Sequence, residues 1–171
     1  MKYKISLLSV LLAILSGCST LTLLEKSFAN AAEEIQEGQM LPITATASIA
    51  GTTINLEVAQ TPEQQAIGLM FRESLADDRG MLFPFKIERT ARFWMKNVPI
   101  SLDMIFIKGD RVISIANNVS PCTTEPCPVY GSNALVDRVL ELRGGRAKEL
   151  GLEVGDRISI QQSNSVPPFS Q

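Results

Sequence analysis

Short β-branched segments separated by turn residues occupy most of the chain between residues 42 and 160. Residues 43–49 and 52–58 are two such segments, and the Ala50-Gly51 pair between them predicts a hairpin. Further strands are predicted at residues 80–85, 91–95, 102–108, 111–117, 136–142 and 156–160. A chain that returns so often to a short extended segment must bury its apolar side chains in a sheet.

Two short helical signals interrupt this pattern. Thr61-Pro62 offers an N-cap and a proline at the first helical position, and Gln64 stands three residues after the cap, which predicts a helix to about Phe71. A second helix is predicted at residues 146–150. The predicted fold is a β-dominated α+β domain over residues 42–160, a small curled sheet or barrel of about seven short strands with two short helices.

The N-terminus has the pattern of a bacterial lipoprotein signal. Lys2 and Lys4 precede an apolar run at residues 5–15, and Leu15-Ser16-Gly17-Cys18 places small residues before a cysteine. The run is too short for a stable membrane span. We therefore expect removal of residues 1–17 as a signal peptide and lipidation of Cys18, whose acyl chains would anchor the protein to a membrane. The alternative is an ordinary signal peptide followed by an incidental cysteine.

Two polar segments flank the predicted domain. Residues 18–41 show no sustained strand alternation, which indicates a tether between the lipid and the domain. Residues 161–171 consist largely of Gln, Ser, Asn and Pro, which is typical of a disordered tail. The expected location is outside the cytoplasm, on the bacterial cell membrane or outer membrane and facing the periplasm or the exterior.

The composition excludes several classes of function. Loss of residues 1–17 removes Lys2 and Lys4, which leaves 14 basic residues against 18 acidic ones and a net charge near −4. Such a surface does not favour nucleic acid as a partner. Histidine is absent, so the commonest general base and the commonest zinc or copper ligand are both missing. We expect no cofactor and no metal site.

Six sequence blocks carry a resemblance to a known family. They are Gly68-Leu69-Met70-Phe71-Arg72, Gly80-Met81-Leu82-Phe83, Phe93-Trp94-Met95-Lys96-Asn97, Pro99-Ile100-Ser101-Leu102-Asp103, Val139-Leu140-Glu141-Leu142 and Gly155-Asp156. In this order they resemble domain-of-unknown-function family 192 (DUF192), a set of small bacterial and archaeal proteins, many of them exported. The resemblance covers residues 54–160. It implies a small β-rich domain with short helices, and it supplies no activity.

Polar and aromatic residues within these blocks form a candidate binding site. We expect Arg72 and Lys96 to hold an anionic group of the ligand, Asn97 to donate a directional hydrogen bond, and Trp94 to offer a stacking face, with Asp103 nearby. Such a cluster suits an envelope ligand such as a sugar, a peptide or a protein. Each residue also has a purely structural interpretation: Trp94 in the core, Arg72 in an ion pair, Asp103 capping a turn.

Three carboxylates leave a catalytic alternative open. Asp78, Asp103 and Glu141 could supply the acid and base of a small hydrolase acting on envelope polymers, a chemistry that does not need histidine. Glu141 lies between two leucines, so it could instead be buried and paired, most simply with Arg138 or Arg143. A pair of carboxylates in one cleft would favour the enzyme. A cleft floored by Trp94 without such a pair would favour a non-catalytic binding module, which is the prediction we prefer.

Two groups of sulfur-containing residues have structural predictions. Cys122 and Cys127 are an even pair in an exported chain whose third cysteine carries lipid, so they predict a disulfide that fixes a proline-rich loop. A redox or metal role for them lacks supporting neighbours. The methionines of the motif region stand beside apolar residues, which favours core filling over binding of Cu(I). They are Met70, Met81, Met95 and Met104.

Overall fold

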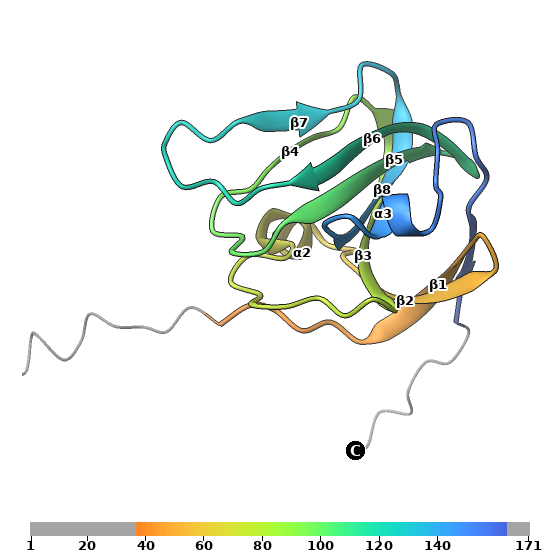
Figure 1. The fold of residues 1–171 in the computed structure, drawn as a ribbon, viewed down its shortest axis with the longest axis horizontal. Coiled ribbons are helices and arrows are strands. Elements are labelled where there is room, and N and C mark those ends of the chain that lie inside the picture. The colour runs from red at the N-terminus through yellow and green to blue at the C-terminus, as the bar shows by residue number, and fades with distance from the viewer. Residues whose placement is uncertain (1–36, 164–171) are drawn as a thin grey trace, which may run out of the picture. The chain divides into compact units, whose positions relative to one another are not determined.

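A curled sheet of seven strands is the main element of the computed structural model, which describes residues 37–163 (Figure 1). The strand order is β6-β5-β8-β3-β2-β1-β9. The strands are β1 (Ile43–Ile49), β2 (Thr52–Val58), β3 (Arg79–Arg89), β5 (Leu102–Lys108), β6 (Arg111–Val119), β8 (Val136–Arg143) and β9 (Ser159–Gln162). Strands β2 and β3 run parallel, and the other neighbours in the sheet run antiparallel.

A two-stranded ribbon and two short helices complete the fold. The ribbon pairs β4 (Arg92–Trp94) with β7 (Val129–Gly131), and Figure 1 shows it at the end of the domain remote from the β1–β2 hairpin. The helices are α2 (Pro62–Ile67) and α3 (Arg146–Glu149). The predicted β-dominated α+β class is confirmed. No helix within residues 37–163 is long and apolar enough to cross a membrane.

Helix α2 begins as the sequence predicts and ends earlier. The Gln64 backbone N–H donates to the Thr61 hydroxyl, and the Gln64 side chain accepts from the Thr61 N–H, so the capping box is complete. At Gly68 the backbone turns to φ 51°, a conformation that favours glycine, and a Cβ there would lie 3.4 Å from the Phe83 ring. The predicted extension to Phe71 is wrong because the chain leaves the helix at this glycine.

The apolar side chains separate into two clusters on the two faces of the sheet. Successive residues of a strand point to opposite faces, so Leu140 and Leu142 enter one cluster and Val139 enters the other. The first cluster also contains Leu56 and Ile105. The second cluster contains Met81, Met95 and Met104 together with Phe83 and Phe106, and the partly buried Met70 packs against it, in agreement with core filling. Glu141 points to the side of this second cluster.

The domain is slightly longer than the sequence predicts at both ends. The Gln39 side-chain amide donates to the carbonyls of Gln64 and Gly68, and the Leu41 N–H donates to Glu57, so the end of the predicted tether belongs to the domain. Strand β9 pairs with β1 as far as Gln162, within the predicted tail, and it starts three residues later than predicted. The ribbon strand β7 was not predicted. Residues 1–36, including Cys18, and residues 164–171 lie outside the described part.

Asp103 fixes the start of α3 from inside the sheet. Its carboxylate is fully buried and accepts hydrogen bonds from the backbone N–H groups of Asn118 at 2.6 Å, Gly145 at 3.0 Å and Ala147 at 2.6 Å. The Gly145 residue that precedes α3 offers no side-chain cap, so this carboxylate takes that role. Asp103 therefore has the structural role of a cap.

We expect Asp103→Ala to lower the free energy of unfolding by about 3 kcal/mol or more, because three backbone donors lose a charged acceptor. Urea denaturation monitored by circular dichroism measures this change. Asp78→Ala is the matched control, since Asp78 is exposed and its side chain contacts only Asn55 at 3.3 Å among the described residues. The control should change the same quantity by less than about 0.5 kcal/mol. Equal effects of the two substitutions would contradict the capping role.

Candidate functional site

A small pocket of about 40 Å³ opens between the end of α2 and the ribbon strand β4. Its walls include Gly68 after the helix, Phe83 on β3, Phe93 and Trp94 on β4, and Glu141 on β8. These five wall residues come from four of the six sequence blocks, although the blocks are far apart in the chain. We refer to this feature as the Glu141 pocket.

Glu141 is a buried carboxyl without a partner. Its Cα pairs with Met81 on β3 and with Met104 on β5, so the side chain stands between two methionine side chains on one face of the sheet. The residue is 4% exposed, and within residues 37–163 its carboxyl has no hydrogen bond and no ion pair. Burial disfavours the charged form and raises the pKa of Glu141 to about 8.

The predicted pairing of Glu141 with an arginine is wrong. Arg138 belongs to the opposite face of β8, and its guanidinium contacts Asp137 at 2.9 Å. Arg143 lies on the same face as Glu141, but at the end of the strand it pairs with Asp77 and Glu149. Both arginines are thus satisfied elsewhere.

Aromatic rings form one side of the pocket. Phe93 packs edge-to-face on Phe83 with ring centroids 5.1 Å apart, and on Phe106 with centroids 6.2 Å apart. This arrangement is favourable for aromatic rings and orients them rigidly. The Phe93 and Trp94 side chains alternate across β4, so Phe93 enters the core and Trp94 remains at the surface.

Exposed apolar side chains lie at and beside the pocket. Trp94 is 47% exposed, and its cross-strand partner Val129 is 55% exposed. Ile67, at the end of α2, is 42% exposed and also lines the pocket. We call Ile67, Trp94 and Val129 the rim patch. Large apolar side chains that gather beside a pocket are typical of a binding surface.

The disulfide loop contributes charge to this rim. Cys122 and Cys127 form the predicted disulfide, with an S–S distance of 2.08 Å. Glu125 within the loop forms an ion pair of 2.9 Å with Lys96, whose ammonium lies 5.5 Å from the centre of the Trp94 ring. The Lys96 contact lowers the pKa of Glu125. Lys96 therefore stands beside Trp94 with its charge balanced by the loop.

A backbone hydrogen bond between two residues with positive φ joins the two walls. Phe71 has φ 62° and Asn97 has φ 57°, and both are non-glycine residues in the left-handed region. The Phe71 N–H donates to the Asn97 carbonyl at 2.7 Å, which ties the segment after α2 to the turn after β4. This hydrogen bond fixes the position of Phe71 relative to Asn97 on the two sides of the pocket.

The structure brings only some of the predicted binding residues to the pocket. Trp94 lines it, Lys96 lies against Trp94, and Asn97 contributes through its backbone. Arg72 is engaged elsewhere, because its guanidinium donates twice to Glu57 at 3.1 Å in a buried ion pair. Asp103 points to the opposite face of the sheet, since it pairs with Leu142 rather than Glu141.

The three carboxylates of the catalytic alternative do not share the pocket. Of the described residues that line it, Glu141 is the only ionisable one. Asp78 is exposed before β3, and Asp103 is buried behind the sheet. No group of three or more cysteine or carboxylate side chains among residues 37–163 is arranged to hold a metal ion.

Sequence reasoning missed the pocket walls Gly68, Phe83 and Phe93. The available signal was their position within the blocks that carry the family resemblance, since all three belong to those blocks. Phenylalanine in a strand indicates core, and only the three-dimensional arrangement shows which core residues border an opening.

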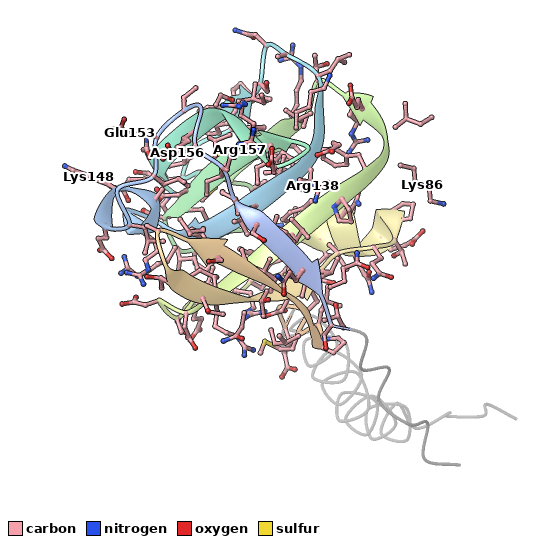
Figure 2. The ribbon with its side chains drawn as sticks, turned by 90° about the vertical axis from the view of Figure 1, so that its right-hand side faces the viewer. Lys86, Arg138, Lys148, Glu153, Asp156 and Arg157 are labelled. Carbon is pink, nitrogen blue, oxygen red and sulfur yellow. A yellow bond between two sulfur atoms is a disulfide. The ribbon has the colours of Figure 1, made fainter. Side chains whose placement is uncertain are left out.

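A larger and shallower cavity of about 570 Å³ lies beside β9. Arg138 and Arg157 border it, and both are labelled in Figure 2. Arg138 contacts Asp137, and Arg157 is paired with Asp110. Both charges are compensated, so this cavity has less binding chemistry to offer than the Glu141 pocket.

A family model matches residues 43–160, which include every wall of the Glu141 pocket. The chain belongs to the DUF192 family. The description of this family is "Uncharacterized ACR". The match confirms the resemblance drawn from the six sequence blocks.

Two solved structures share this fold. A protein of unknown function from Novosphingobium aromaticivorans is 37% identical, with a TM-score of 0.61 over 68% of this chain and 83% of its own. A Sinorhizobium meliloti protein that carries the provisional name of a transcription regulator is 34% identical, with a TM-score of 0.62 over 71% of this chain and 97% of its own. Among curated proteins, none matches this chain.

The buried Glu141 should make stability depend on pH. Its pKa rises from 4.5 to about 8 on folding, so the unfolded chain releases the proton first and stability falls as pH rises through this range. The total loss in the free energy of unfolding is roughly 5 kcal/mol, at 1.36 kcal/mol for each unit of pKa. We expect Glu141→Gln to be more stable than the native protein at pH 8.5 and to lose less stability between pH 5.5 and 8.5, as measured by urea denaturation. Parallel pH profiles of the two proteins would contradict this assignment.

Proposed function

We propose that this protein is a lipid-anchored, non-catalytic binding module of the bacterial cell envelope, and that its ligand enters the Glu141 pocket across the rim patch. The observation that carries the proposal is a buried carboxyl without a partner at a pocket whose mouth exposes Trp94. Desolvation disfavours the charged form of this carboxyl, and a ligand that supplies a partner for it would offset that cost.

The arrangement of carboxylates favours binding over hydrolysis. Glycoside hydrolysis uses two carboxyl groups about 5 to 10 Å apart in one cleft. Glu141 has the raised pKa of a general acid, but its pocket has no second ionisable wall residue among those described. A half-exposed tryptophan beside a single carboxyl is better suited to holding a ligand than to cleaving one.

The export signal and the disulfide support the same compartment. The Lys2-to-Cys18 pattern predicts a lipid anchor, although Cys18 lies outside the described residues. Disulfides persist mainly in oxidising compartments, and Cys122–Cys127 is consistent with a domain that acts outside the cytoplasm.

Nucleic acid is a poor candidate for the ligand. One structural relative carries the provisional name of a transcription regulator. The exported chain would have 14 basic and 18 acidic residues, which opposes binding to a phosphate backbone. We therefore do not extend that name to this protein.

We expect Trp94→Ala to weaken binding of soluble peptidoglycan fragments at least about tenfold, because the ligand loses its aromatic contact. Isothermal titration of the full-length protein in detergent measures the affinity. Val154→Ala, which shortens an exposed side chain between α3 and β9, is the control and should leave the affinity unchanged. Both variants should stay within about 1 kcal/mol of the native stability. Unchanged binding by Trp94→Ala, or no binding by the native protein, would contradict the proposed role.

The anchor is tested separately. We expect the protein isolated from its native membrane to begin at Cys18 and to carry acyl chains, as determined by intact mass, because the signal ends at this residue. Cys18→Ser should move the protein from the membrane fraction to the soluble fraction. A mass that corresponds to retained Met1 without acyl groups would refute the anchor.

A further inference from the structure

The Glu141 pocket has the size of a side-chain tip. A cavity needs roughly 10–15 Å³ to hold one water molecule, and this pocket has about 40 Å³. A small head group with one or two carbon atoms therefore fits, whereas a sugar ring does not. The part of the ligand that enters the pocket must therefore be the end of a longer group, and the rest of the ligand lies on the rim patch.

The charges around the pocket select the sign of this head group. Lys96 at the rim is paired with Glu125, Arg72 is paired with Glu57, and Asp103 faces the other side of the sheet. The strands beside Glu141 present Met81 and Met104, which do not titrate. Gln65 of α2 is also neutral, and its amide donates to the carbonyls of Ala59 and Pro84. No lysine or arginine among the described residues lines the pocket, so Glu141 meets the ligand without a competing cation inside it.

We propose that the Glu141 pocket binds a primary alkylammonium group, such as the end of a lysine-like side chain, and this inference rests on the proposed function. An ammonium group has three donors and no acceptor, which complements a carboxylate that only accepts. The rings of Phe83, Phe93 and Trp94 line the pocket, and aromatic faces attract cations. The methylene groups of the ligand would then lie against Ile67 and Trp94.

Binding of this group is coupled to a proton. In the free protein at pH 7 the Glu141 carboxyl is mainly protonated, because its pKa is about 8. The ammonium group binds the carboxylate, so the O–H bond of Glu141 breaks and the proton passes to water. The ligand is held by an ion pair and forms no covalent bond with the protein. The affinity should therefore rise about tenfold per pH unit between pH 6 and 7.5 and level off above pH 8.

Trp94 provides the readout, since it is the only tryptophan in the chain. The probe is Nα-acetyl-lysine methylamide, added to the full-length protein in detergent while tryptophan fluorescence is recorded from pH 6 to 9. The matched probes are the norleucine analogue, which lacks the amine, and the Nε-acetylated lysine analogue, which lacks the charge. We expect saturable binding of the lysine probe and at least tenfold weaker binding of the other two.

Glu141→Gln keeps the shape of the side chain and removes the negative charge. It should weaken binding of the lysine probe at least tenfold at pH 8 and abolish the rise of affinity with pH. Glu153→Gln is the matched control, because Glu153 is exposed between α3 and β9 (Figure 2), and it should bind as the native protein does. Circular dichroism checks that both variants are folded.

Several outcomes would overturn the inference. Equal binding of the norleucine or Nε-acetyl probe, no binding of the lysine probe, or native affinity in Glu141→Gln would each do so. A second ligand, peptidoglycan fragments with acetylated amines, distinguishes failure of the ammonium assignment from failure of the proposed function. If these fragments bind in a Trp94-dependent manner and the lysine probe does not, only the ammonium assignment is wrong. If neither binds, the proposed function fails as well.

Discussion

Strand β8 is covered on both faces, and this constraint determines what the rest of the domain can do. The strand lies between β3 and β5, with one hydrophobic cluster on each side. Every side chain in its middle must therefore leave water, whichever way it points. Leu140 and Leu142 are apolar, so their burial is favourable. Burial of Glu141 instead disfavours its charged form. The candidate site exists because a polar residue occupies a position where the sheet demands an apolar one.

The three buried carboxylates of the domain differ in the partners that stabilise their charge. Glu57 has Arg72 and a backbone N–H, which is the usual solution for a buried acid. Asp103 has three backbone N–H donors and joins α3 to the sheet. Glu141 has neither, within the part of the chain that the structure describes. Buried acids with a structural role have a partner within the fold, as Glu57 and Asp103 do. Glu141 has none among the described residues, so it is the residue to examine for ligand chemistry.

The sequence predicts most of the fold because its strands are short, β-branched and well separated by turns. Strand β5 has the predicted bounds of residues 102–108, and the capping box of α2 was visible at Thr61 and Gln64. Strand β7 was missed because it is short and pairs only with β4, so its order depends on contacts across the chain. The site was harder to predict. Trp94 could be named from its residue type, but the partners of Arg72 and Asp103 come from distant segments that local patterns do not connect.

The ring closed by Cys122 and Cys127 places a carboxylate next to the cation that lies beside Trp94. Its Glu125 carboxylate is held against Lys96, and Lys96 lies against Trp94. Both side chains are largely exposed, at 41% for Lys96 and 63% for Glu125, so water and salt screen the pair and its own free energy is small. The covalent ring restricts the segment that carries Glu125 and so favours an ion pair that would otherwise be too weak to order two long side chains.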